Sequence, residues 1–175
     1  MEIQIRKLSP NESNSYRHIR LECLKNYPEY FTTDYQDEIL KERLFFQPFI
    51  EQSDANNFVI GAFSNNNLIG ISGFKRNERR KASHGGIIIQ VYVNPEYQGK
   101  SIGSNMIKAT LNEAFTLDGI EQIEIGVIAI NENAENIYKK IGFQEFGLQK
   151  NFLKINDKYY DHRMLMIFKN EYLNQ

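Results

Sequence analysis

Apolar and polar residues alternate over the first eight positions of the chain, and this period of two predicts a β-strand. The sequence SPNE at residues 9–12 then predicts a helix start. Serine is a favoured N-cap, Pro10 suits the first helical position, and Glu12 completes a capping box. Pro28 ends this helix, whose apolar face carries Ile19, Cys23 and Tyr27. Cys23 is therefore expected to be a packed core thiol rather than a nucleophile.

The next part of the chain predicts a loop, a helix and a hairpin. Residues 28–38 form a loop with several aromatic residues, and the second helix continues through Lys41, Leu44 and Phe45. Two apolar runs, 58–62 and 68–74, are expected to be strands joined by the polar tetrapeptide 64–67. Gly70 and Gly73 in the second strand indicate a bulge or a close backbone contact.

A strand, a turn and a helix follow in residues 87–115. Residues 87–93 are apolar and rich in β-branched side chains, Asn94-Pro95 ends the strand, and from Ile102 apolar residues recur at helical spacing. Gly99 and Gly103 lie between the two elements and have no β-carbon to block a ligand. Free N–H groups at the start of a helix, together with the helix dipole, form a binding site for phosphate oxygens.

The last third of the chain predicts a strand, a helix and a closing hairpin. The strand covers residues 120–130, and a helix capped by Asn131 or Asn133 runs from there to Gly142, which suits the left-handed C-terminal position. Residues 143–148 and 159–168 are expected to be two further strands around a turn at Asn156-Asp157.

Composition narrows the class of protein. The 175 residues fit one domain, and 41% hydrophobic with 25% charged residues is ordinary for a globular protein. A net charge of −1 gives no field that would gather nucleic acid or an anionic membrane. The single cysteine, with no long apolar run and no signal-like N-terminus, leads us to expect a cytoplasmic protein without nucleic-acid or membrane partners.

Three interpretations of the glycine-containing turn remain after this survey. It can be a plain strand-to-helix turn, or the phosphate loop of an NTPase, since Gly99-Lys100-Ser101 spells the end of that motif. The NTPase motif requires a further glycine five residues before Gly99, where this chain has Asn94. The third interpretation is the pyrophosphate loop of an acetyltransferase.

Residues 98–104, QGKSIGS, resemble the coenzyme A pyrophosphate loop of the GNAT superfamily of N-acetyltransferases. The family pattern is Gln or Arg, two residues, Gly, one residue, then Gly or Ala, so Gln98 and Gly103 match while Ser101 replaces a glycine. A second segment, NENAENIYKKIGF at residues 131–143, is similar to a further GNAT pattern and matches it at Asn131, Ala134, Tyr138 and Gly142-Phe143. Residues 18–31 and 154–168 are also similar to one branch of the superfamily.

The resemblance implies a GNAT domain over residues 1–175, of α/β (α+β) class, with a mixed, mostly antiparallel central sheet and helices on both faces. It further implies acetyl-CoA as co-substrate, with no metal and with homodimers possible. The pantetheine arm would lie on Val91, Tyr92 and Val93, in a splay between the fourth and fifth strands. The remaining cofactor-binding residues implied are Gln98, Gly99, Lys100, Ser101, Ile102, Gly103, Ser104 and Asn131. The Ser101 hydroxyl is expected to donate a hydrogen bond to a phosphate rather than to crowd it.

Acetyl transfer to an amine requires a neutral amine, a stabilised oxyanion and a proton for the departing thiolate. The resemblance makes Tyr138 the predicted general acid, since a phenol with a pKa of about 10 can protonate a thiolate at neutral pH. Without the resemblance, Tyr138 would be interpreted as a core tyrosine of an amphipathic helix. By resemblance, Phe31, Tyr35 and Glu38 are placed near the acceptor, which is expected to be a primary amine of a small molecule or peptide. The general base is left open, with Glu124 and His84 as substitutes for the glutamate that some GNAT members carry.

Two other functions stay open at this stage. One is a module that binds coenzyme A without catalysis, and the other is an acetyltransferase that modifies protein N-termini or lysines. Metal chemistry is not expected, because no cluster of Cys, His and Asp residues accompanies His84.

Overall fold

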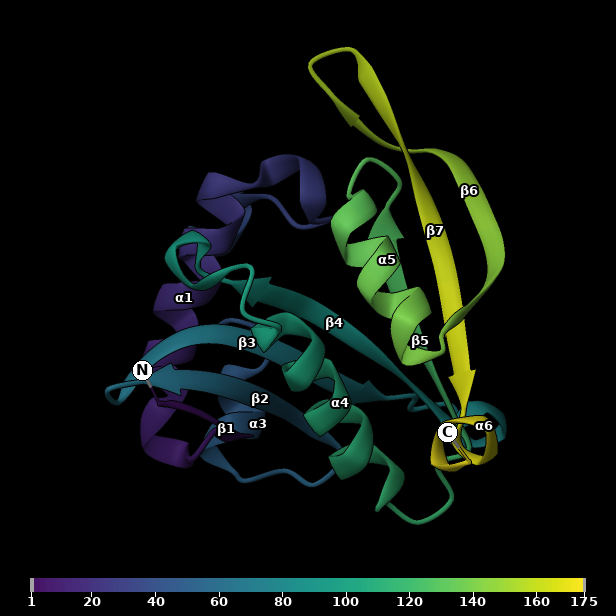
Figure 1. The fold of residues 1–175 in the computed structure, drawn as a ribbon. Coiled ribbons are helices and arrows are strands. Elements are labelled where there is room, and N and C mark those ends of the chain that lie inside the picture. The colour runs from purple at the N-terminus through teal and green to yellow at the C-terminus, as the bar shows by residue number, and fades with distance from the viewer. Residues whose placement is uncertain (1, 175) are drawn as a thin grey trace.

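The computed structural model describes residues 2–174, which form a seven-stranded sheet in the order β1-β2-β3-β4-β5-β7-β6 (Figure 1). The strands are β1 (Ile3–Lys7), β2 (Asn57–Ser64), β3 (Asn67–Arg76), β4 (Gly85–Val93), β5 (Gln122–Ile128), β6 (Gln144–Ile155) and β7 (Lys158–Phe168). All neighbouring pairs are antiparallel except β4 and β5. The expected mixed, mostly antiparallel sheet is confirmed.

The helices cover both faces of this sheet (Figure 1). They are α1 (Ser13–Asn26), α2 (Tyr35–Ile39), α3 (Gln47–Glu51), α4 (Ile102–Phe115), α5 (Glu132–Ile141) and α6 (Lys169–Leu173). Short 3-10 turns are η1 (Pro10–Glu12), η2 (Pro28–Tyr30), η3 (Arg80–Ala82) and η4 (Pro95–Tyr97). No helix among the described residues is long and apolar enough to cross a membrane.

The predicted capping box at the first helix is confirmed, although its first turn is the 3-10 turn η1. The Ser9 backbone N–H donates to the Glu12 carboxylate at 2.7 Å. Arg6 donates two hydrogen bonds to the same carboxylate, at 2.7 and 2.8 Å, and together with the Ser9 bonds lowers the pKa of Glu12 to about 2. The box therefore ties the start of α1 to β1.

The predicted second helix through Lys41, Leu44 and Phe45 is wrong, because the structure has two short helices, α2 and α3, with non-helical chain between them. Arg17 on α1 holds that connection by donating to the backbone carbonyls of Ile39, Lys41 and Glu42. These contacts stabilise a non-helical path between α2 and α3, so tertiary contacts override the local helical pattern.

Both predicted hairpins are confirmed. Asn65 and Asn66 have φ of 48° and 66°, and Asn156 and Asp157 have φ of 46° and 64°. Two consecutive residues with positive φ make the tight turn that matches the twist of paired strands. The closing hairpin is longer than expected, since β6 runs to Ile155, and in Figure 1 it projects beyond the rest of the sheet.

The hydrophobic core is split by the sheet into two clusters. The cluster beneath α4 and α5 includes Ile88, Met106, Ile125 and Tyr138. The cluster beneath α1 and α3 includes Tyr16, Cys23, Phe46, Ile71 and Tyr92. Cys23 is fully buried, as its place in the helix pattern predicted.

β4 is irregular in its second half. Between the pairs Ile71–Tyr92 and Gly73–Ile89, β4 contains one residue more than β3, which is a β-bulge. Gln90 lies in this bulge with φ of 60°, a conformation that few residues other than glycine adopt. The bulge confirms the irregularity expected from the glycines of β3, since a Cβ on Gly73 would lie 2.4 Å from the Phe46 ring.

β4 and β5 separate beyond the first part of their length. Their parallel pairing runs only from Gly85–Gln122 to Ile88–Ile125. Residues 89–93 of β4 and 126–128 of β5 are unpaired with each other, so the sheet opens at this point. A splay between the fourth and fifth strands was implied by the GNAT resemblance, and the register of this pair contains one.

Candidate active site

A cavity of about 1010 Å³ lies where β4 and β5 separate. Its wall includes Val91, Val93 and Ile107, which pack with the core cluster beneath α4. It also includes Ile89 and Tyr92, which belong with the cluster beneath α1. The cavity is therefore lined by residues that pack with both core clusters, one on each face of the sheet.

The turn between β4 and α4 walls one part of this cavity. Among the described residues, the backbone N–H groups of residues 99–104 donate no backbone hydrogen bond; the regular pattern begins with Asn105, which donates to the Ser101 carbonyl at 3.0 Å. The Gln98 side chain holds the turn against β4 by donating to the Val93 carbonyl at 3.0 Å. A row of free N–H groups at the start of a fourteen-residue helix is suited to a diphosphate.

The backbone conformation of the turn explains why glycine is found at positions 99 and 103, and it shows what serine costs at position 101. Gly99 has φ of 77°, and Ser101, the N-cap of α4, has φ of 58° and ψ of 12°. This left-handed conformation favours glycine, so serine at position 101 keeps the shape at some cost in strain. A Cβ on Gly103 would lie no closer than 3.7 Å to its nearest neighbour, Val93, so the packing leaves the space above Gly103 open.

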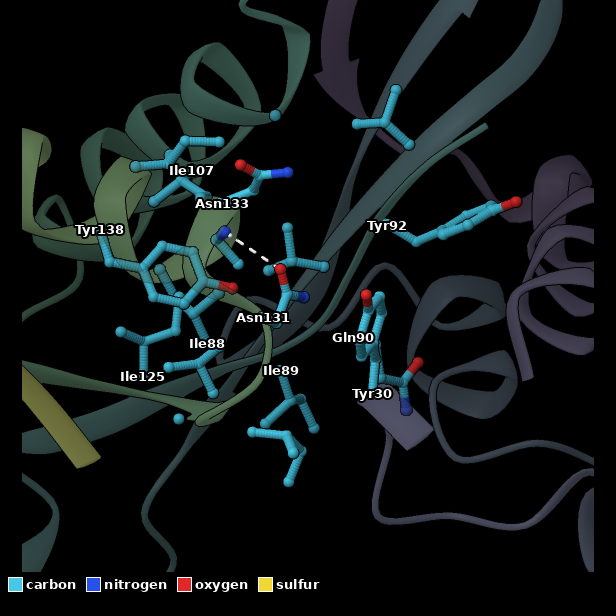
Figure 2. A pocket seen from close by; sticks show the side chains of 18 of the residues that line it. Tyr30, Ile88, Ile89, Gln90, Tyr92, Ile107, Ile125, Asn131, Asn133 and Tyr138 are labelled. Carbon is cyan, nitrogen blue, oxygen red and sulfur yellow. Dashed lines mark hydrogen bonds between the residues drawn. The ribbon is translucent and has the colours of Figure 1, made fainter. Parts of the chain in front are cut away.

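Most of the predicted cofactor-binding residues lie on the cavity wall. These are Val91, Tyr92, Val93, Gln98, Gly99, Ser101, Ile102, Gly103, Ser104 and Asn131. Lys100 is the exception, because its ammonium group points to the Tyr97 ring, 5.6 Å from the ring centre. Asn131 also caps α5, since its side-chain oxygen accepts a hydrogen bond from the Ala134 N–H at 3.2 Å (Figure 2).

Tyr138 projects from α5 into the same cavity. Figure 2 shows its hydroxyl directed towards the middle of the cavity, near Ile88 and Asn131. The residue is 6% exposed, and its hydroxyl makes no hydrogen bond within residues 2–174. Burial raises the pKa of Tyr138 well above its usual value, so the hydroxyl keeps its proton at neutral pH. A protonated phenol without a partner is available as a donor to a ligand.

The predicted acceptor residues divide between the cavity and the interior. Phe31 lies on the cavity wall. The structure does not bring Tyr35 and Glu38 to that wall, because α2 turns them inwards. Tyr35 packs against the core cluster beneath α1, and the buried Glu38 carboxylate pairs with Lys41.

The sequence profile of the Acetyltransferase (GNAT) family matches residues 16–143, which is most of the chain. The chain belongs to the GNAT family. Among the three interpretations of the turn at residues 98–104, membership in this family favours the acetyltransferase one, and acetyl-CoA is the co-substrate of the family.

Individual relatives are similar over part or all of the chain. The spermidine N(1)-acetyltransferase of Escherichia coli K12 is 32% identical over 84 residues, which cover 48% of this chain and 45% of that enzyme. The chain thus matches about half the length of this curated relative. A GNAT acetyltransferase of Streptococcus pneumoniae has the same fold, with a TM-score of 0.84, 21% identity, and coverage of 95% of this chain and 99% of that one.

A third relative was solved with its cofactor acetyl-CoA, an acetyltransferase from Salmonella typhimurium. It superposes with a TM-score of 0.77 and 15% identity, covering 96% of this chain and 94% of that chain. The GNAT fold of the present chain therefore closely follows one that is known to hold acetyl-CoA.

Sequence reasoning missed several wall residues of this GNAT protein, including Gln90, Arg20 and His162. Gln90 is the one polar side chain in the run from Ile87 to Val93, which was a readable signal, and its side-chain oxygen accepts a 2.7 Å hydrogen bond from the Tyr16 hydroxyl. Arg20 occupies a buried position on the apolar face of α1, where a charge is unexpected. His162 on β7 gave no signal, because only pairing with β5 brings it to the cavity.

Neither base suggested from sequence lies on the wall of the GNAT cavity. Glu124 sits opposite Ile87 in the paired part of β4 and β5, and His84 precedes β4, where its carbonyl accepts from the Glu121 N–H. His162 does line the cavity, its imidazole stacked on Phe152 with ring centres 4.6 Å apart. A Cβ at position 126 would lie 2.2 Å from His162 Nε2, so only glycine leaves room for the imidazole there. Within residues 2–174, no group of three or more His, Cys, Asp or Glu side chains could hold a metal ion.

Proposed function

We propose that this protein transfers an acetyl group from acetyl-CoA to a primary amine of a small molecule, by direct attack within a ternary complex. The observation that carries the proposal is the cavity at the splay of β4 and β5, with the free N–H groups of residues 99–104 in its wall and the Tyr138 hydroxyl directed into it. Acetyl-CoA supplies the activated acyl group as a thioester.

The cofactor would be held by backbone on the α4 side. The N–H groups of Gly99 to Ser104 would bind the diphosphate, and the Ser101 hydroxyl, which makes no hydrogen bond within the described chain, is free to add one. The unpaired edge of β4 at Val91, Tyr92 and Val93 offers backbone groups to the amides of the pantetheine arm. The bulge at Gln90, in the pairing of β4 with β3, directly precedes this segment.

The proton transfers would be divided between two side chains. The amine nitrogen forms a bond to the acyl carbon while the carbon–sulfur bond breaks, so the amine must lose a proton and the sulfur must gain one. Tyr138, whose hydroxyl is directed into the cavity, would donate a proton to the sulfur. His162 is the base we propose, acting directly or through water. Burial lowers the pKa of His162 below its usual 6.5, so the imidazole is neutral and able to accept a proton at pH 7.

The chemical class proposed for the acceptor is inferred from the names of similar enzymes. The Escherichia coli enzyme is named for acetylating spermidine, a small molecule with primary amines, and this supports a small-molecule amine for the present chain. Such an amine is mostly protonated at neutral pH, with a pKa of about 10, so a base in the cavity is needed.

Two measurements test this function. Calorimetry should show acetyl-CoA binding, and a panel of primary amines should release free thiol from acetyl-CoA in an acceptor-dependent way. Binding without acceptor-dependent release would instead identify a coenzyme A-binding module. No stabilisation by acetyl-CoA in a thermal-shift experiment would reject the proposal.

A further inference from the structure

Arg20 is a buried cation on the wall of the proposed active site. It projects from α1, is 2% exposed, and lines the cavity. No carboxylate of the described chain lies within ion-pairing distance of it. Its one side-chain hydrogen bond within residues 2–174 runs from Nη1 to the Cys23 sulfur at 3.5 Å, and the buried Nε has no partner. Burying a guanidinium without an anion is costly, so this arrangement indicates a missing anionic partner.

Among the described residues, the rest of the cavity wall also lacks negatively charged side chains. No aspartate or glutamate of the described chain lines it, and the other basic side chains on the wall are Lys140 and His162. A polyamine acceptor would bring several positive charges into this space with no carboxylate to receive them. The wall is therefore unsuited to a polycation and suited to a ligand with negative charge.

The surroundings of Arg20 orient its guanidinium for an oxyanion. The Phe31 ring lies against it, with the guanidinium carbon 5.0 Å from the ring centre. Tyr27 and Tyr30 stack on each other nearby in the chain, with ring centres 5.7 Å apart, and all three aromatic residues line the cavity. The N–H donors of a guanidinium lie in one plane, which matches the two oxygens of a carboxylate or phosphonate.

We propose that the acceptor is an amine that also carries an oxyanion, such as an amino acid with an apolar side chain, and that Arg20 binds this anion. The inference rests on the proposed acetyltransferase function and names its substrate class. The aromatic side chains would receive the apolar body of the acceptor, while the anion at Arg20 fixes the position of the amine in the cavity.

Matched acceptors test the charge preference of the wild-type protein. The panel pairs phenylalanine with phenethylamine, adds the phosphonate analogue of phenylalanine, and includes spermidine, with thiol release as readout. We expect kcat/KM for the two anionic amines to exceed that for phenethylamine by at least about tenfold. The larger of the two values identifies carboxylate or phosphonate as the preferred oxyanion. Equal rates, or a preference for spermidine, would overturn the inference while leaving acetyl transfer intact.

Two substitutions locate the preference at Arg20. Arg20→Met should abolish it, chiefly by raising KM for phenylalanine, whereas Lys25→Met removes an exposed charge from the same helix and should leave it unchanged. Because Arg20 has no charged partner, Arg20→Met should keep or raise the melting temperature. A lower melting temperature would indicate a structural arginine, and weaker acetyl-CoA binding would assign it to the cofactor. Either result contradicts the proposal.

A binding experiment separates the inference from the proposed function. N-acetylphenylalanine keeps the carboxylate and cannot be acetylated again, so its titration into the protein does not depend on catalysis. We expect saturable binding by the wild type and by Lys25→Met, and at least about tenfold weaker binding by Arg20→Met. Failure to bind acetyl-CoA would reject the proposed function and with it the acceptor role, even if N-acetylphenylalanine still bound at Arg20. Identical titration of all three proteins would reject the role of Arg20 alone.

Discussion

The turn at residues 98–104 and the segment at residues 20–33 wall the same cavity, yet they contribute different kinds of chemistry. The turn offers backbone N–H groups fixed by the strand before it and the helix after it. The segment offers side chains, namely the Arg20 guanidinium and the rings of Tyr27, Tyr30 and Phe31. A cofactor with constant chemistry can be held by backbone, whereas an acceptor that differs between enzymes is selected by side chains.

This difference has a physical basis in how each region tolerates change. Backbone donors persist under substitution as long as the turn keeps its shape, which depends on a few positions such as Gly99. Side-chain donors vanish with a single substitution, as they would at Arg20. On the proposed function, we expect the turn at residues 98–104 to hold the cofactor and the α1 side to define what this chain acetylates.

The largest effect is expected at the junction of the two regions. Tyr138→Phe removes only the hydroxyl, which makes no hydrogen bond within the described chain, so the fold should keep its stability. Loss of a general acid should lower kcat by about 100-fold or more while leaving acetyl-CoA affinity unchanged. Single-turnover kinetics and calorimetry measure the two quantities. Tyr172→Phe, at a hydroxyl bonded to Asn112 away from the cavity, is the control, and an unchanged kcat in Tyr138→Phe would remove the assignment.

The strand, turn and helix around residues 98–104 could be predicted from sequence because their determinants are local. The strand, turn and helix occupy consecutive residues, and Gln98 and Gly103 report a backbone shape that a short pattern can specify. The capping box at residues 9–12 and the two hairpin turns were predictable for the same reason. Each depends on residues within a few positions of one another.

The acceptor side could not be predicted in this way, because it is assembled across the sheet. His162 reaches the cavity only because β7 pairs with β5 and Gly126 leaves room for its ring. Tyr35 and Glu38 were placed by resemblance, and α2 directs them elsewhere because Arg17 holds the chain after it. The separation of β4 and β5 depends on where their pairing stops, and no local pattern in either strand states that point.

A smaller effect is expected at His162, on the side-chain-built part of the cavity. His162→Gln should lower kcat/KM by about tenfold to 100-fold at pH 7, since a base is lost while much of the packing volume is kept. Burial lowers the pKa of His162, so in the wild type the neutral, active form prevails at pH 7 and activity falls only as the pH drops through that lowered value, below 6.5. The pH profile of His162→Gln should lack this fall in activity at acidic pH, which we call the acidic limb of the profile.

The control for the pH profile is His18→Gln, which removes an exposed histidine of α1 and should keep the limb. Rates are compared from pH 5 to pH 9 with acetyl-CoA saturating, so that the profile reports the acceptor step. An acidic limb that survives in His162→Gln would assign it to another group, and the base would then have to be sought outside this imidazole.

The smallest effect is expected within the backbone-built turn, at the residue that departs from the family pattern. Ser101→Gly relieves a left-handed conformation that costs serine about 1 kcal/mol, partly offset by the greater freedom of glycine in the unfolded chain. Stability should rise slightly, and acetyl-CoA affinity should fall by no more than about fivefold, the worth of one hydroxyl hydrogen bond. Ser101→Ala keeps the strained backbone and loses the hydroxyl, so its affinity isolates that bond. A large loss of acetyl-CoA affinity in Ser101→Gly would mean that the serine side chain, and not the backbone, binds the diphosphate. The distinction between a backbone-built and a side-chain-built region of the cavity would then be wrong.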